Sequence, residues 1–111
     1  ETTNPLRASK VISLGDKEYT ANMSLDTIIR IETKMNMGLF AIARTIAEGN
    51  FTMSNIITIL TVSIRSSGTD IKESDVKVIV SELGIEKSLK IISELLQAVL
   101  GDGTEEEKKS Q

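Results

Sequence analysis

Apolar residues at helical spacing, each run closed by a glycine, constrain the fold of this chain more than any other feature. They recur at i, i+3, i+4 and i+7 over residues 39–46, and Gly49 follows. The same spacing covers residues 76–83, and Gly84 follows. Such spacing places the apolar side chains on one face of a helix, and glycine favours the left-handed conformation that ends many helices. Each run is therefore predicted to be an amphipathic helix that packs on other elements.

Three further helices are predicted. Ser24 suits an N-cap before an apolar stripe over residues 25–35, which we expect to face the core. Residues 52–65 are rich in β-branched side chains, which favour a strand, but adjacent apolar pairs break strict alternation and indicate a buried helix. The last stripe covers residues 85–100, and Gly101-Asp102-Gly103 is predicted to end it.

The chain begins with a segment typical of a β-hairpin. Ile12 and Leu14 share one face of a first strand, Gly15-Asp16 is a turn signal, and Tyr19 and Ala21 point inward from the return strand. Two strands alone are marginal in water and need a packing partner. The predicted fold class is mainly α (α+β), an N-terminal β-hairpin packed on a bundle of about five helices.

The expected organisation is one domain followed by a short tail. A single globular domain is predicted over residues 1–103, with the hairpin at about 10–23 and the helices at about 25–100. Residues 104–111 are wholly polar and rich in charge, and we expect a disordered charged tail there.

The composition argues against catalysis and for binding. The chain has no histidine and no cysteine, which removes the commonest general base, the Cys nucleophile and the usual soft metal ligands. We therefore expect no catalytic site, no cofactor and no metal. The formal net charge of −3 argues against nucleic acid as a partner. No apolar run approaches the ~18 residues of a membrane span, and no signal peptide is recognised, so a cytosolic protein is expected.

Short motifs, mostly structural, follow one another in a fixed order from residue 4 to about residue 100. They are Asn4-Pro5-Leu6-Arg7, Leu14-Gly15, Tyr19-Thr20, Ile31-Glu32, Met37-Gly38-Leu39, Ala43-Arg44, Ala47-Glu48-Gly49, Met53-Ser54-Asn55-Ile56 and Gly68-Thr69-Asp70. This order resembles a small family from the tail-gene modules of phages, prophages and gene transfer agents. Its members are labelled gene transfer agent family protein, phage tail tube protein or tail assembly chaperone. This chain has more Ile, Lys and Asn and less Ala and Arg than usual members.

The resemblance implies a part in phage tail morphogenesis. It suggests a tail assembly chaperone that binds the tape-measure protein, the tail tube protein or both, in the cytoplasm of the bacterial host. The alternative is a structural, tube-associated protein that stays in the virion tail. Tube subunits are usually β-rich and this chain offers one hairpin, which favours the chaperone.

The candidate partner surface lies on the last helix. Its apolar stripe is broad, so some side chains are expected to stay exposed when the main seam is filled, and these could form a possible protein-partner surface. The alternative is that the stripe is simply core. Self-association to a homo-oligomer is also expected. The candidate residues are Ile91, Leu95, Leu96, Val99 and Leu100.

Two other features have alternative interpretations. Met23, Met35, Met37 and Met53 fill gaps in an aliphatic core or form an adaptable binding surface. Glu32 borders the apolar face of its helix and is interpreted as a structural carboxylate, paired with an arginine, and not as an acid or base.

Overall fold

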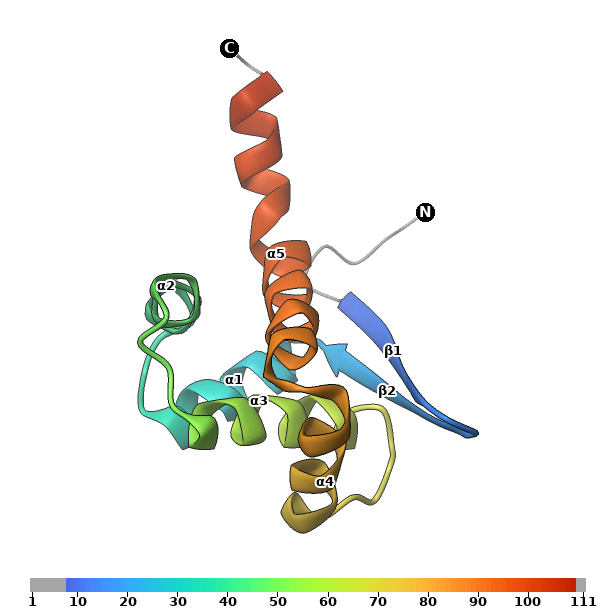
Figure 1. Ribbon diagram of the computed structural model, residues 1–111. Coiled ribbons are helices and arrows are strands. Elements are labelled where there is room, and N and C mark those ends of the chain that lie inside the picture. The colour runs from blue at the N-terminus through green and yellow to red at the C-terminus, as the bar shows by residue number, and fades with distance from the viewer. Residues whose placement is uncertain (1–7, 110–111) are drawn as a thin grey trace.

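The computed structural model describes the backbone of residues 8–109 and the side chains of residues 8–101. Within that part the chain forms an antiparallel hairpin and five helices, which confirms the predicted fold class (Figure 1). The elements are β1 (Ala8–Leu14), β2 (Lys17–Met23), α1 (Leu25–Met35), α2 (Leu39–Glu48), α3 (Met53–Arg65), α4 (Glu73–Leu83) and α5 (Ile85–Lys109).

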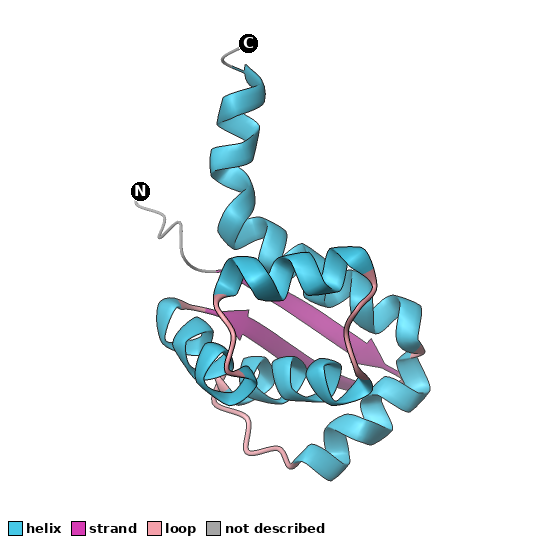
Figure 2. Cartoon of the chain, turned by 90° about the vertical axis from the view of Figure 1, so that its left-hand side faces the viewer, coloured by secondary structure: helices cyan, strands magenta, loops and turns pink. Residues whose placement is uncertain are grey.

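The hairpin forms one layer and the helices cover one of its faces (Figure 2). Its register runs without a bulge from Ala8 opposite Met23 to Leu14 opposite Lys17. Gly15 has φ +61°, which suits the first central residue of a type II′ turn. On the covered face the strands bury three side chains, Ile12, Ala21 and Met23.

Helix α1 begins as its sequence predicts. The hydroxyl of Ser24 accepts the backbone N–H of Thr27 at 3.3 Å, and Asn36 closes the helix in the left-handed conformation. Ile28 and Ile31 are buried. The predicted width of the stripe is wrong, however, because Leu25 and Ile29 are 53% and 49% exposed.

Helix α3 is the centre of the helical layer, which confirms the prediction of a buried helix despite its β-branched side chains. Thr52 and Asn55 form a reciprocal capping box at its start. From Ile59 to Ile64 every side chain is buried. Helix α3 packs on β2, α1, α4 and α5, so apolar side chains are buried all around it. This tertiary packing outweighs the local preference of its β-branched residues for a strand.

Helices α4 and α5 meet at Gly84, whose φ of +92° ends α4 as predicted. The carboxylate of Asp75 accepts the backbone N–H of Lys72 at 3.1 Å and completes the start of α4. Helix α5 continues through Gly101, where the sequence predicted its end, and extends beyond the body of the domain (Figure 1). The side chains of residues 102–111 lie outside the described part, and a disordered tail over 104–111 stays a prediction.

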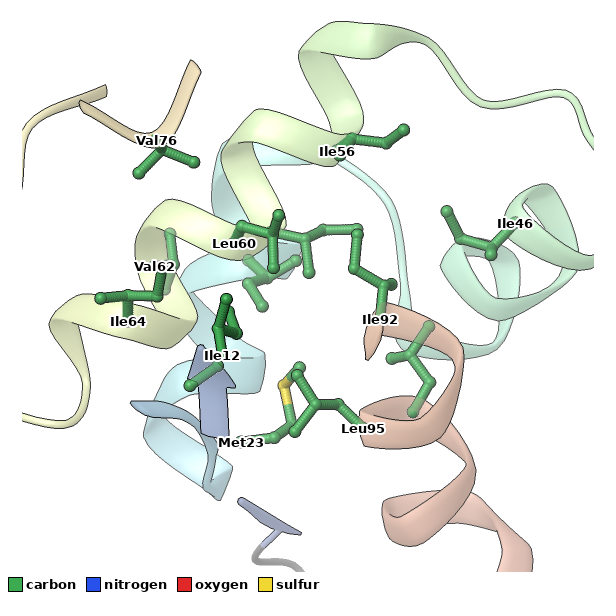
Figure 3. Packing of buried hydrophobic residues seen from close by; sticks show 14 of the residues in the cluster. Ile12, Met23, Ile46, Ile56, Leu60, Val62, Ile64, Val76, Ile92 and Leu95 are labelled. Atoms are coloured by element: carbon green, nitrogen blue, oxygen red, sulfur yellow. The ribbon is translucent and has the colours of Figure 1, made fainter. Parts of the chain in front are cut away.

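The core is aliphatic, as the scarcity of aromatics requires. Figure 3 shows buried side chains from the hairpin, α2, α3, α4 and α5 that converge in one cluster. Tyr19 and Phe51 pack only at its border, and Phe40 is 72% exposed. The largest fully buried side chains of the described part include Ile12, Met23, Ile42, Ile56, Leu60, Ile64, Ile92 and Leu95.

Candidate protein-binding surface

The five residues predicted to meet a partner do not form one exposed surface on the folded chain. Leu95 is 0%, Leu96 5% and Val99 8% exposed, because these side chains pack in the core. Ile91 and Leu100 are half-buried. In the isolated chain the apolar stripe of α5 therefore packs mainly within the domain. This is the alternative interpretation that the sequence left open.

Two of the five residues nevertheless border a groove between α2 and α5. Its volume is about 110 Å³, room for only a few water molecules. Small side chains on both helices keep the groove open, and buried Ile46 and Leu96 lie at its base. The residues of this α2–α5 groove are Ala43, Ile46, Ala47, Ser93, Leu96, Gln97 and Leu100.

Helix α2 forms one wall of this groove and is held to the rest of the domain by few interactions. It buries only Ile42 and Ile46. Its N-cap is Gly38, which has no side chain to cap the helix, and the carboxylate of Glu32 on α1 accepts the backbone N–H of Leu39 at 2.8 Å instead. The expected pairing of Glu32 with an arginine is not found within residues 8–101. Glu32 therefore has a structural role, as a cap supplied by a neighbouring helix.

A second apolar groove, which the sequence did not single out, lies between α3 and the junction of α4 with α5. Its volume is about 520 Å³. Met53 and Ile85 stand 45% and 49% exposed beside it. Of the four methionines, Met23 is core, two are half-buried and Met53 has the exposure that an adaptable surface needs. The residues of this α3–α4 groove are Met53, Ile57, Lys77, Val80, Ser81, Gly84 and Ile85.

The charged side chains considered next lie on the surface of the protein. A hollow of about 390 Å³ lies between the hairpin and α4; its lining is polar and apolar in about equal parts and includes Asp70, Asp75 and Glu82. Within the residues that the structure describes, no three acidic side chains are grouped to hold a metal ion. Lys10 on β1 donates to Glu94 on α5 at 2.6 Å, and this hydrogen bond holds the pKa of the Glu94 carboxyl below its usual value.

The comparison with protein families decides the identity of the chain. The family described as phage tail tube protein, GTA-gp10, matches residues 7–102. The chain belongs to this family. Its match covers the hairpin, all of α1 to α4 and α5 as far as residue 102, so the resemblance inferred from the order of short motifs is confirmed. No curated protein and no solved structure matches the chain.

Membership in the GTA-gp10 family gives the chain a role in the phage tail, as a structural or an assembly protein. That role fits the virion tail or the host cytoplasm during assembly. In the part of the chain that the structure describes, no helix is both long enough and apolar enough to cross a membrane.

Proposed function

We propose that this GTA-gp10 family protein is a tail assembly chaperone that holds an apolar helix of the tape-measure protein, without catalysis. The observation that carries the proposal is the α2–α5 groove, where buried Ile46 and Leu96 lie between small side chains. Small residues on facing helices allow a third helix to approach closely, and an amphipathic helix in a groove is a common mode of recognition. The absence of histidine and cysteine supports a role in binding and not in catalysis.

The architecture supports a role in tail assembly more than permanent incorporation into the tail tube. A tube subunit is expected to be β-rich, whereas the described part of this chain contributes a two-stranded hairpin and five helices. An aliphatic helical body suits transient shielding of a long apolar protein until tube subunits polymerise around it.

A structural tail protein is the second candidate, and the family description, phage tail tube protein, favours it. Under either function a homo-oligomer remains part of the proposal, because copies aligned along a tail would contact one another. Sedimentation at high protein concentration tests this, and a monomer at all concentrations would contradict it.

The α3–α4 groove is the competing location for the partner, because Met53 and Ile85 are exposed there. Two matched variants separate the locations. Leu100→Asp adds charge at the rim of the α2–α5 groove, and Ile85→Asp adds the same charge at the α3–α4 groove. Neither side chain is fully buried, so both variants are expected to fold.

The experiment is co-expression of each variant with the neighbouring tape-measure protein, followed by affinity capture and thermal unfolding of the purified chain. We expect capture to be lost with Leu100→Asp and kept with Ile85→Asp. Loss with Ile85→Asp alone would move the site to the α3–α4 groove. Failure of the wild-type chain to capture the tape-measure protein, with stoichiometric presence in purified particles by mass spectrometry, would establish the structural alternative instead.

A further inference from the structure

Helix α2 differs from the other helices in how it is held. Within the described part of the chain its backbone lies close to α1 and α5 alone, whereas the backbone of α3 lies close to four elements. Figure 2 shows α2 in front of the sheet, with a loop at each end. No side-chain hydrogen bond or ion pair joins α2 to α5 within residues 8–101. Elements with few buried contacts are the ones that open at low free-energy cost.

The two ends of α2 are suited to act as hinges. Gly38 precedes the helix, and Gly49 follows it with φ +77°. At neither glycine does another group lie within 4 Å of the place where a side chain would project. The side-chain hydrogen bond that ties α2 to α1 is the one from the Leu39 N–H to Glu32, at 2.8 Å. That bond is charge-assisted and works as a latch on the first turn of α2.

The surface beneath α2 is an apolar seat. The side chains there pack closely, with no room left for a water molecule, and Leu39 and Ile42 are the ones that α2 contributes. If α2 moves away, the remaining lining is wholly aliphatic and comes from four elements. These residues are Met23 from β2, Ile28 and Ile31 from α1, Ile59 from α3 and Leu96 from α5.

We propose that α2 is a displaceable lid, latched by Glu32, and that the seat it uncovers accepts an amphipathic helix in its place. The side chains that α2 already places in the seat define the kind of helix that fits there. Leu39, Ile42 and Ile46 lie at i, i+3 and i+7 on α2, so a helix with aliphatic side chains at that spacing makes the same contacts. This proposal rests on the proposed function, since it makes an apolar helix of the tape-measure protein that occupant.

The small volume of the α2–α5 groove makes such a movement necessary for access to the seat. The groove holds only about 110 Å³, so a helix can lie along its rim in the closed state but reaches the seat only if one wall retreats. Helix α5 is fixed by buried Ile92, Leu95 and Leu96, which leaves α2 as the movable wall. Because the open state is the minor one, the apparent affinity for the partner is reduced by its population, and weakening the latch raises that affinity.

Hydrogen exchange of the free protein, measured by mass spectrometry, tests the lid without any partner. We expect amides of α2 to exchange at least about tenfold faster than those of α3. Glu32→Ala removes the cap and should speed exchange in α2 by a further factor of about five, with α3 unchanged, because loss of a helix cap is a local effect of that size. Glu32→Gln keeps an acceptor and should restore part of the protection. Glu48→Ala, at the other end of α2, is the matched control and should change nothing.

A peptide of residues 36–50 is a probe for the vacated seat. The labelled peptide should bind the wild type, and it should bind Glu32→Ala with about the same affinity, because the substitution removes the hydrogen bond of the Leu39 N–H both from α2 and from the peptide that replaces it. A peptide with serine in place of Ile42 and Ile46 should not bind. Exchange in α2 as slow as in α3, or equal acceleration everywhere in Glu32→Ala, would overturn the lid. Capture of the tape-measure protein by a chain with no opening of α2 would refute the lid and keep the chaperone.

Discussion

Replacement of Leu95 by alanine is the sharpest test of where the last helical stripe lies. Leu95 is fully buried and belongs to the cluster that joins α5 to the hairpin, near Met23 (Figure 3). A buried Leu→Ala change removes transfer free energy and leaves a cavity, so we expect a loss of about 3 kcal/mol in the free energy of unfolding. For a chain of this size that loss lowers the unfolding midpoint by about 12 °C or more.

The matched change is Leu100→Ala, on the same helix and in the same predicted surface. Leu100 is half-buried at the rim of the α2–α5 groove, so we expect a loss of only about 1 kcal/mol or less. Calorimetry and denaturant titration of both variants give the comparison. A wild-type midpoint for Leu95→Ala, or equal losses for the two variants, would refute the packing of α5 on the hairpin.

Three other changes test local features. Because its hydrogen bond with Lys10 lowers the folded pKa of Glu94, that carboxylate stabilises the fold above its unfolded pKa of about 4.3, and the contribution disappears as pH falls through the lower folded value. Glu94→Gln should therefore be less stable than wild type near neutral pH and approach it in acid, below the lowered pKa of the folded Glu94 carboxyl, as thermal melts across the range would show; a constant difference at every pH would contradict this. Gly49→Ala places a side chain at φ +77° and should cost about 1 kcal/mol in denaturant titration, and no loss would mean that the turn relaxes freely. Gly101→Ala should raise the midpoint slightly, because alanine favours a helix by about 1 kcal/mol over glycine and the three atoms nearest to the new methyl all belong to the flexible side chain of Gln97, with Nε2 at 3.0 Å; a fall would show that Gln97 cannot move aside.

Local signals in the sequence predicted the elements well. The hydroxyl of Ser24, the turn at Gly15-Asp16 and the stop at Gly84 act within a few residues of themselves, so their effects are visible in the chain. Periodicity also identified the buried face of α4, since Val76 and Ile79 are both buried. The predicted end of α5 was wrong, since the helix continues through Gly101. A glycine inside a helix costs only about 1 kcal/mol, which is too little to end it.

The candidate surface was harder to predict, because periodicity gives the apolar face of a helix but not what covers it. Leu25 and Ile29 belong to a regular stripe and yet are half exposed, whereas Leu95, outside the main seam, is fully buried. The α3–α4 groove joins residues about thirty positions apart, and no local signal marks it. Glu32 was recognised as structural, but its partner is a backbone amide, which no side-chain pattern reveals.

The sequence by itself determined a mainly helical chain with a hairpin, an aliphatic core and membership in a phage tail family, because turns, caps, stripes and short motifs are local. Tertiary structure alone decided which apolar side chains stay accessible. Burial depends on contacts between elements distant in sequence, such as Leu96 beneath α2 and the amide of Leu39 at the carboxylate of Glu32. The apolar stripe of the last helix over residues 85–100 is accordingly mostly core, and access to Leu96 depends on the weakly held helix α2, which lies over it.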